Sequence, residues 1–462
     1  MVRHPVVKQR GAPAAAGETT ETLAGTSGRR RLAWTATALL PLLPLFGYLL
    51  LGDLVWSLKE RAVQELVKAQ LREFSQHPVL LNILFGALPA LLALAAGPPI
   101  GAWSDRTRTR WGRRIPFLLV CAPLLALFIA GLAFSETLAD ALMALGGAAP
   151  AHRTLVVVAC IAVLWTLFDL VSIVGNALFI ALVNDTVPQA LLGRFFGLFR
   201  IVSLAVGVVF FHYVFGGGLQ ADIGDVLLAI AAAYLLGFLV VCLRVREPAY
   251  PPPAASGQRG LGRLRVTEQD DPRFYCLLFA AVGVAAVSVL AVNINSYNAI
   301  SQFGVDRADF GNAVALTYCV SMLLALPLGW LADRTHPLRV GLVVLVLYCL
   351  SMLAAWLLVT DRASFLAGFV LHGVLAGAFL SGTAALLPTL LPRERFSELA
   401  AFSASVTAVL TVAFTLGLGL LLDWSGRDFR LIFLVAGLGA GLASCLWYGL
   451  LRAQRRRCSL RH

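Results

Sequence analysis

Apolar runs alternate with short charged or Pro/Gly-rich joints along nearly the whole chain. A helix that crosses a bilayer needs roughly 20 consecutive apolar residues, and about twelve runs reach that length. We place the expected spans at residues 38–66, 79–103, 116–135, 154–184, 195–215, 223–244, 273–301, 311–331, 338–359, 364–391, 398–422 and 430–451. The pattern therefore predicts an all-α, polytopic membrane protein with twelve transmembrane helices.

The amino-acid composition supports this fold class. Of 462 residues, 59% are hydrophobic and 13% are charged, and the mean hydropathy is +0.81. A soluble domain cannot bury so large an apolar fraction. The eight cysteines stand mostly alone inside apolar runs, which indicates buried thiols and no metal site.

The net charge of +12 is distributed unevenly along the chain. With both termini placed in the cytoplasm, the inside segments contain 27 Lys and Arg residues and the outside segments contain nine. The positive-inside rule then predicts a multi-pass protein of the plasma (inner) membrane with both termini cytoplasmic. The basic charge thus reflects topology, and we expect the lipid bilayer, not nucleic acid, as the partner.

A joint rich in Pro, Gly and charged residues separates the sixth span from the seventh. The expected organisation is a disordered cytoplasmic tail at 1–33, a six-helix bundle at 34–245, a cytoplasmic linker at 246–272, a second six-helix bundle at 273–452 and a basic cytoplasmic tail at 453–462. The first segment lacks an apolar stretch followed by a cleavage site, so it predicts a tail and not a signal peptide.

The two halves repeat a short motif at the end of their second span. Both residues 101–107 and residues 329–335 read G-x-x-x-D-R-T. An internal repeat in a twelve-span protein suits two bundles that rock against each other.

The longer string G-x-x-x-D-R-x-x-x-x-x-G-R-R resembles the cytoplasmic signature of the major facilitator superfamily. The full sequence SDRTRTRWGRRIPF is similar to that of the glycoside–pentoside–hexuronide cation symporters and the sucrose–proton symporters. This resemblance implies the major facilitator fold, with two six-helix bundles, and transport of a sugar together with a cation.

The motif residues are candidates for a cytoplasmic gate. An acid at this place can cap a helix or pair with an arginine across the bundle interface, which would hold one state closed. The other interpretation is that the arginines only anchor the loop at lipid headgroups, and we expect the arginines to do both. The gate candidates are Gly101, Asp105, Arg106, Gly112, Arg113, Arg114, Gly329, Asp333 and Arg334.

Charged residues inside a span normally face a cavity or a partner, because insertion of each costs about 2.5–3.5 kcal/mol. In the first span, Asp53, Trp56 and Glu60 share one helical face. This stripe predicts a helix that lines a polar cavity. Alternatively the span ends near residue 58 and an outside amphipathic helix follows, which is the interpretation we favour for Lys68 and Arg72.

The fourth and fifth spans carry further candidates. Trp165, Asp169 and Asn176 lie on one face of the fourth span, and Arg200 lies inside the fifth. We expect Arg200 to pair with Asp169, since opposite charges at similar depth cost less together than apart. The resemblance implies that Asp53, Asp169 and Arg200 bind sugar and couple its movement to the cation.

The second half has few charges inside its spans. Asn295, Asn298 and Gln302 share a face of the seventh span, and amides suit recognition of hydroxyl groups. His372 in the tenth span is expected to be a hydrogen-bonded structural histidine. The second span offers only Asn82 where the sodium-using relatives of the resemblance place an acidic pair, which favours protons over sodium.

Together these features predict a secondary active transporter that moves a glycoside or disaccharide with protons by alternating access. We expect a monomer without a cofactor, and no spacing of nucleophile and base indicates an enzyme. Two alternatives are a facilitator-type exporter of another small organic solute and a membrane assembly factor that transports nothing. The export alternative predicts a mainly aromatic cavity, and the assembly alternative needs no polar cavity.

Overall fold

The computed structural model describes residues 42–75, 77–107, 109–147, 149–217, 222–247, 272–392 and 396–459. Residues 48–462 form one compact unit, and every contact reported below lies within it. The whole of the tail predicted at 1–33 and most of the linker predicted at 246–272 lie outside the described residues.

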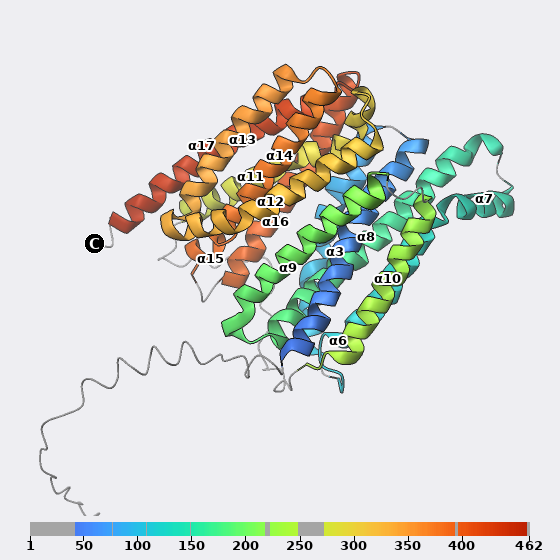
Figure 1. The fold of residues 1–462 in the computed structure, drawn as a ribbon, viewed down its shortest axis with the longest axis horizontal. Helices are drawn as coiled ribbons and strands as arrows, with labels where there is room; N and C mark the ends of the chain where they lie inside the picture. The colour runs from blue at the N-terminus through green and yellow to red at the C-terminus, as the bar shows by residue number, and fades with distance from the viewer. Residues whose placement is uncertain are drawn as a thin grey trace, which may run out of the picture. The chain divides into compact units, whose positions relative to one another are not determined.

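The described part is almost entirely helical (Figure 1). The first half contains α3 (Leu43–Phe74), α4 (Pro78–Asn82), η2 (Ile83–Ala87), α5 (Leu88–Arg106), α6 (Ile115–Ala133), α7 (Ser135–Gly146), η3 (Pro150–His152), α8 (Arg153–Thr186), α9 (Gln189–Val209), η4 (Phe210–Phe215) and α10 (Ile223–Arg244). The second half contains α11 (Pro272–Gln302), α12 (Arg307–Thr335), α13 (Pro337–Leu358), α14 (Arg362–Thr383), α15 (Leu386–Leu390), α16 (Phe396–Trp424) and α17 (Leu431–Ser459).

These helices confirm the predicted all-α, multi-pass membrane fold. Within the described residues, 11 helical segments are long and apolar enough to cross a membrane, and each coincides with an expected span. Helix α3 coincides with the remaining expected span but is not among the 11, and its middle carries Asp53, Lys59, Glu60 and Arg61.

Two helix boundaries and one additional helix differ from the sequence prediction. Helix α3 does not end near residue 58 but continues to Phe74, because the residues that follow are good helix formers and many are buried against neighbouring helices. Helix α7 is an additional short helix between the third and fourth spans. Helix α17 continues to Ser459, so most of the predicted tail at 453–462 prolongs the last span.

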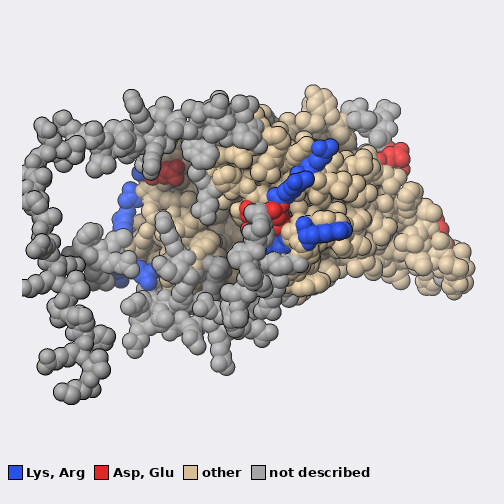
Figure 2. Space-filling view, turned by 90° about the horizontal axis from the view of Figure 1, so that it is seen from below, with Lys and Arg blue, Asp and Glu red and all other residues tan. Residues whose placement is uncertain are grey.

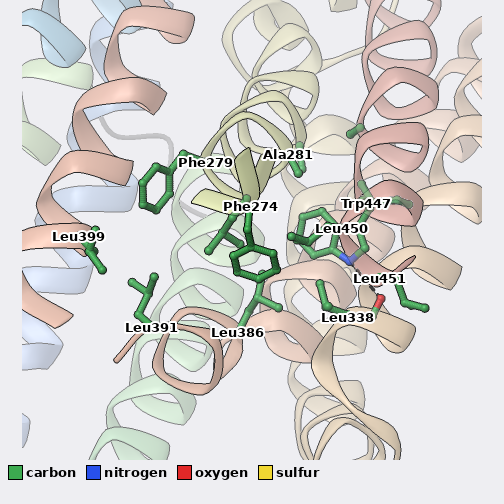
Figure 3. Packing of buried hydrophobic residues seen from close by; sticks show 14 residues of the cluster. Phe274, Phe279, Ala281, Leu338, Leu386, Leu391, Leu399, Trp447, Leu450 and Leu451 are labelled. Carbon is green, nitrogen blue, oxygen red and sulfur yellow. Dashed lines mark hydrogen bonds between the residues drawn. The ribbon is translucent and has the colours of Figure 1, made fainter. Parts of the chain in front are cut away.

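Each half is held together by apolar packing between its own helices. In the second half, α17 packs extensively on α11 and on α13. Figure 3 shows the buried cluster at this junction, which includes Phe274, Leu338 and Trp447. The indole Nε1 of Trp447 donates a hydrogen bond to the carbonyl of Leu338 at 3.0 Å, which satisfies the one polar atom of this buried side chain.

The two halves contact each other through α4, η2 and α5 on α16 and through α9 and η4 on α12. Glycine permits a close approach at the ends of these helices. A Cβ atom on Gly419 would lie 3.0 Å from the Cα of Val79, and one on Gly311 would lie 2.6 Å from the carbonyl oxygen of Phe211. We call the end of the molecule that contains these two contacts the closed end.

A larger residue at Gly311 should force the closed end apart. Gly311→Val places its side chain against Phe211 and Gly216, whereas Gly417→Val is the control because no atom lies within 4 Å of a Cβ there. The readout is cross-linking by a bifunctional maleimide between cysteines at positions 77 and 427, because His77 Nδ1 and Arg427 Nη2 lie 3.3 Å apart across the halves. In a background without native cysteines, we expect the yield to fall severalfold with Gly311→Val only. An unchanged yield would show that this glycine contact does not close the molecule.

Candidate functional site

The centre of the first half contains a buried lysine that the sequence prediction missed. Lys59 of α3 is 1% exposed, and its ammonium donates a hydrogen bond to the hydroxyl of Ser172 on α8. Its Nζ lies 3.7 Å from the centroid of the Trp56 ring, and Phe168 is a second aromatic neighbour. Cation–π contacts and a hydrogen bond therefore replace part of the water that the ammonium loses on burial. Lys59 lies off the polar face that Asp53 marks, which is why the helical pattern did not identify it.

Two acids attract this lysine, first the neighbouring Glu60 and then Asp169 of α8. The charges of Asp169 and Lys59 attract each other, while Oδ2 of Asp169 is buried and has no hydrogen-bond partner. The expected pair of Asp169 with Arg200 is therefore not what the structure contains. The electrostatic neighbours of Arg200 are Arg61 and Tyr318. Helix α3 brings the Lys59 side chain to Ser172, which lies one turn from Asp169 on α8. Helix α9 instead places Arg200 near Arg61 and Tyr318.

The two predicted tryptophans lie within the first half, in contact with other aromatic rings. Trp56 is 5% exposed and packs on Phe179, whose ring centroid lies 6.4 Å away. Trp165 is 4% exposed and donates a hydrogen bond from Nε1 to the carbonyl of Leu84 at 2.9 Å. Neither ring is accessible to a solute in this conformation, so stacking of a sugar on them stays a prediction.

The other predicted polar residues of α3 and α8 differ in exposure. Asp53 is 7% exposed, and its Oδ2 is buried without a hydrogen-bond partner. Glu60 is exposed, although it lies near the middle of α3, and Asn176 is half-buried. The polar stripe of α3 therefore contains both buried and accessible groups.

Two of the three predicted amides of α11 form contacts that hold helices together. Asn295 is fully buried and accepts a hydrogen bond at 3.0 Å from Asn82 of α4, across the two halves. Gln302 accepts a hydrogen bond from the backbone N–H of Phe429 at 2.7 Å and donates one to Asp428. Asn298 is 4% exposed, and its Nδ2 has no partner.

Asp428 lies in the joint between α16 and α17, outside the membrane-spanning segments. A hydrogen bond from Arg430 holds the pKa of its carboxyl below the usual range, and Gln302 contributes in the same direction. The charged form of Asp428 is therefore the one that binds the end of α11.

A polar chain that crosses between the halves was not predicted. Lys68 of α3 is 2% exposed; its Nζ contacts Glu65 at 2.8 Å and donates to the carbonyl of Asn293 on α11 at 3.1 Å. The side-chain oxygen of Asn293 lies 3.0 Å from Nε2 of His372, whose Nδ1 lies 2.7 Å from the hydroxyl of Tyr348. Lys68 thus lies between the two halves, and its assignment to an outside amphipathic helix was wrong.

Arg72 also contacts the second half. Its guanidinium lies 5.4 Å from the ring centroid of Tyr297 on α11. The structure therefore corrects the assignment of Arg72 as it does that of Lys68, because the unbroken α3 brings both side chains onto α11.

The predicted gate loop ties together the ends of four helices of the first half. The carboxylate of Glu247, just after α10, accepts hydrogen bonds from the backbone N–H groups of Arg113, Arg114 and Ile115 at 2.7–2.9 Å. Gly112 has φ of +109°, and a Cβ there would lie 2.5 Å from the Glu247 side chain. This close approach and this backbone conformation both require glycine.

The two arginine side chains of this loop bind a second acid. Arg113 forms a two-pronged ion pair with Asp185 at the end of α8, with its shorter contact at 2.7 Å. Arg114 contacts the same carboxylate at 3.4 Å and Ser104 of α5 at 2.5 Å. These contacts lie within the first half, whereas the predicted gate contact crosses between the halves.

The structure describes the side chains of the other gate candidates only in part. The side chains of Gly101, Asp105 and Arg106 lie outside the described residues. In the second half, Asp333 is exposed, and the guanidinium of Arg334 lies 4.4 Å from the ring centroid of Trp330. Figure 2, which views the molecule from below, shows acidic and basic side chains side by side in the middle of the visible face.

Residues 274–460 match the family model described as Major Facilitator Superfamily. Solved structures of transporters match over most of the chain. A D-xylose–proton symporter matches with a TM-score of 0.65 and 12% identity, over 87% of this chain and 96% of the other. The chain has the major facilitator fold.

Two other transporter types share this fold. A bacterial homologue of the human lysosomal transporter Spinster, inward-facing and occupied, matches with a TM-score of 0.63 and 12% identity, over 88% of this chain and 96% of that one. A bacterial homologue of the iron transporter ferroportin matches with a TM-score of 0.56 and 19% identity, over 88% and 99%. No curated protein matches the chain. The matching family and structures are those of transporters, not of enzymes.

In the major facilitator fold, substrates bind near the middle of the bilayer at the interface between the repeats. Lys59, Asp169 and His372 lie near the middle of α3, α8 and α14, and Asn293 lies in the last third of α11.

Loss of the Glu247 charge should loosen the ends of the first-half helices. Glu247→Gln weakens three charge-assisted hydrogen bonds, and we expect it to lower the free energy of unfolding by about 1–3 kcal/mol. Glu136→Gln removes an exposed ion pair with Arg153 and is the control, with an expected change of about 0.5 kcal/mol. Denaturant unfolding of the purified proteins would measure both. Equal effects would contradict a special role of Glu247.

Proposed function

We propose that this chain is a secondary active transporter that moves a sugar or glycoside together with protons by alternating access. The observation that supports it best is the buried Lys59 in the middle of α3, which is attracted by the half-buried Asp169 in the middle of α8. A titratable pair at this place costs insertion energy that a purely structural protein would avoid. Such pairs in transporters bind or relay the coupling ion.

Protonation of Asp169 supplies the coupling step in this proposal. While Asp169 is charged, it attracts Lys59, which is held by Ser172 and the ring of Trp56. A proton on Asp169 removes this attraction and lets the ammonium donate to a solute instead. The same helix carries Lys68, which binds α11. A shift of α3 would therefore alter the contact between the halves.

The solute class follows from the polar atoms that have no partner. Buried acceptors without a hydrogen bond include Asp53 Oδ2 and Glu65 Oε2, and buried donors include Arg61 Nε and Asn298 Nδ2. Hydroxyl groups both donate and accept, so sugar hydroxyls suit donors and acceptors of this kind. A D-xylose–proton symporter has the same fold, which supports a sugar as solute.

The distribution of Lys and Arg residues supports one orientation of this structure in the membrane. Four of the nine outside Lys and Arg residues, namely Lys59, Arg61, Lys68 and Arg72, belong to α3. Without them only five remain outside against 27 inside. With both termini in the cytoplasm, the closed end faces the outside.

A specific observation favours the export of an amphipathic compound as a second candidate function. An open groove of about 370 Å³, lined by the second half and by Ala90 of the first, is almost wholly apolar. It is lined by Ala90, Val282, Leu387, Ala400, Ser403, Ala404, Thr407, Ala408 and Thr411. An exporter would bind its compound there, whereas the sugar proposal places the solute between α3, α8 and α11.

The proposal predicts that Asp169→Asn uncouples transport from the proton gradient. Proteoliposomes with an imposed pH gradient and a radiolabelled panel of xylose, sucrose and melibiose would measure uphill uptake and counterflow. We expect uphill uptake to fall at least tenfold while counterflow persists. Asp225→Asn, at an exposed position in the first turn of α10, is the control. Uphill uptake by Asp169→Asn would refute the coupling role. The absence of counterflow by the wild-type protein would favour the assembly-factor alternative.

A further inference from the structure

Two arginines of the first half come together where it meets α12. Arg61 of α3 donates a hydrogen bond from Nη2 to the hydroxyl of Ser203 on α9 at 2.8 Å. Ser203 lies three residues after Arg200, so both project from the same face of α9. The positive charges of Arg61 and Arg200 are close enough to repel each other.

The second half contributes an aromatic side chain to the same place. The guanidinium carbon of Arg61 lies 4.4 Å from the ring centroid of Tyr318 on α12, and Tyr318 also interacts electrostatically with Arg200. A Cβ on Gly207 would lie 2.7 Å from the Tyr318 ring. Glycine thus lets α9 and α12 approach closely enough for Arg61 to contact the tyrosine.

The positive charge at this place is only partly balanced. Among the described residues, no carboxylate is an electrostatic neighbour of Arg200. Asp53 attracts Arg61, but Asp53 is also subject to repulsion by Glu60. The Nε atom of Arg61 is buried and has no hydrogen-bond partner. The two positive charges of Arg61 and Arg200 repel each other in a partly buried site, and the Nε donor of Arg61 is unused. An anion bound there would relieve the repulsion and accept the hydrogen bond.

We propose that Arg61, Arg200, Ser203 and Tyr318 form a subsite for an anionic group, namely a carboxylate, sulfate or phosphate. Guanidinium groups bind such groups with paired hydrogen bonds, and the hydroxyls of Ser203 and Tyr318 supply further donors. The inference rests on the proposed function in one respect, which is that the anionic group belongs to the transported sugar. Because Tyr318 belongs to the second half, binding of the anion depends on the contact between α9 and α12.

Paired probes test this subsite on the full-length purified protein. Binding is measured by thermal stabilisation at constant ionic strength, with glucose against glucuronate, glucose against glucose 6-phosphate, and sulfate or phosphate against chloride. We expect each anionic probe to bind at least tenfold more tightly than its counterpart. Arg200→Gln and Arg61→Gln should each remove this preference, and Arg200→Lys should retain part of it. Arg153→Gln, an exposed arginine that pairs with Glu136 and Asp140, is the matched control.

The outcomes separate the subsite from the proposed function. A preference for sulfate or phosphate alone that disappears in Arg200→Gln supports the anion subsite but refutes its assignment to a sugar. No stabilisation by any anion, or a preference that survives in both glutamine variants, overturns the inference. Uphill uptake of a neutral sugar by a protein without anion preference would leave the proposed function standing. Anion binding without uphill transport would refute the function and leave the subsite.

Discussion

The burial of charged groups on α3 is the constraint on which the central structure depends. An ammonium or guanidinium inside a membrane protein must find hydrogen bonds, counter-charges or aromatic faces, because lipid offers none. Lys59 finds Ser172, Asp169 and Trp56 in its own half, whereas Lys68 finds Glu65 and the α11 backbone in the other. One helix therefore carries both the internal pair of the first half and a contact that joins the halves. A change in charge at the first place can be transmitted to the second along a rigid helix.

The two ends of the molecule are held by different forces. At the closed end, glycines such as Gly311 and Gly419 allow backbones of opposite halves to touch, so the contact depends on shape. At the loop that follows α5, Asp185 and Glu247 bind the Gly112–Arg114 segment within one half, so that contact depends on charge and hydrogen bonds. The two glycine contacts can separate without leaving a buried charge unpaired, although the contact of the buried Lys68 with Asn293 also crosses between the halves. A rocking motion of the halves would separate the glycine contacts at the closed end. It would preserve the ion pairs and hydrogen bonds of the Gly112–Arg114 segment.

The fold could be predicted from the sequence because lipid imposes one rule on every span. Each apolar run must form a helix that satisfies its own backbone, and so the expected spans coincide with helices. The first span was the exception, since charges that normally end a membrane helix continue inside the protein here. The pattern could show that Lys68 is charged, but not that α11 lies beside it. The same limitation explains why Lys59 was missed and why Arg200 was paired with the wrong partner.

The sequence by itself determined the fold class, the span positions and the candidate residues Asp53 and Asp169, because hydropathy and charge are properties of single residues and their neighbours along the chain. Only the tertiary structure decided which charges meet. The pairing of Lys59 with Asp169, the contact of Lys68 with Asn293 and the approach of Arg61 to Arg200 join helices that are far apart in sequence. Their geometry depends on the rotation of each helix in the bundle, and packing against all its neighbours sets that rotation.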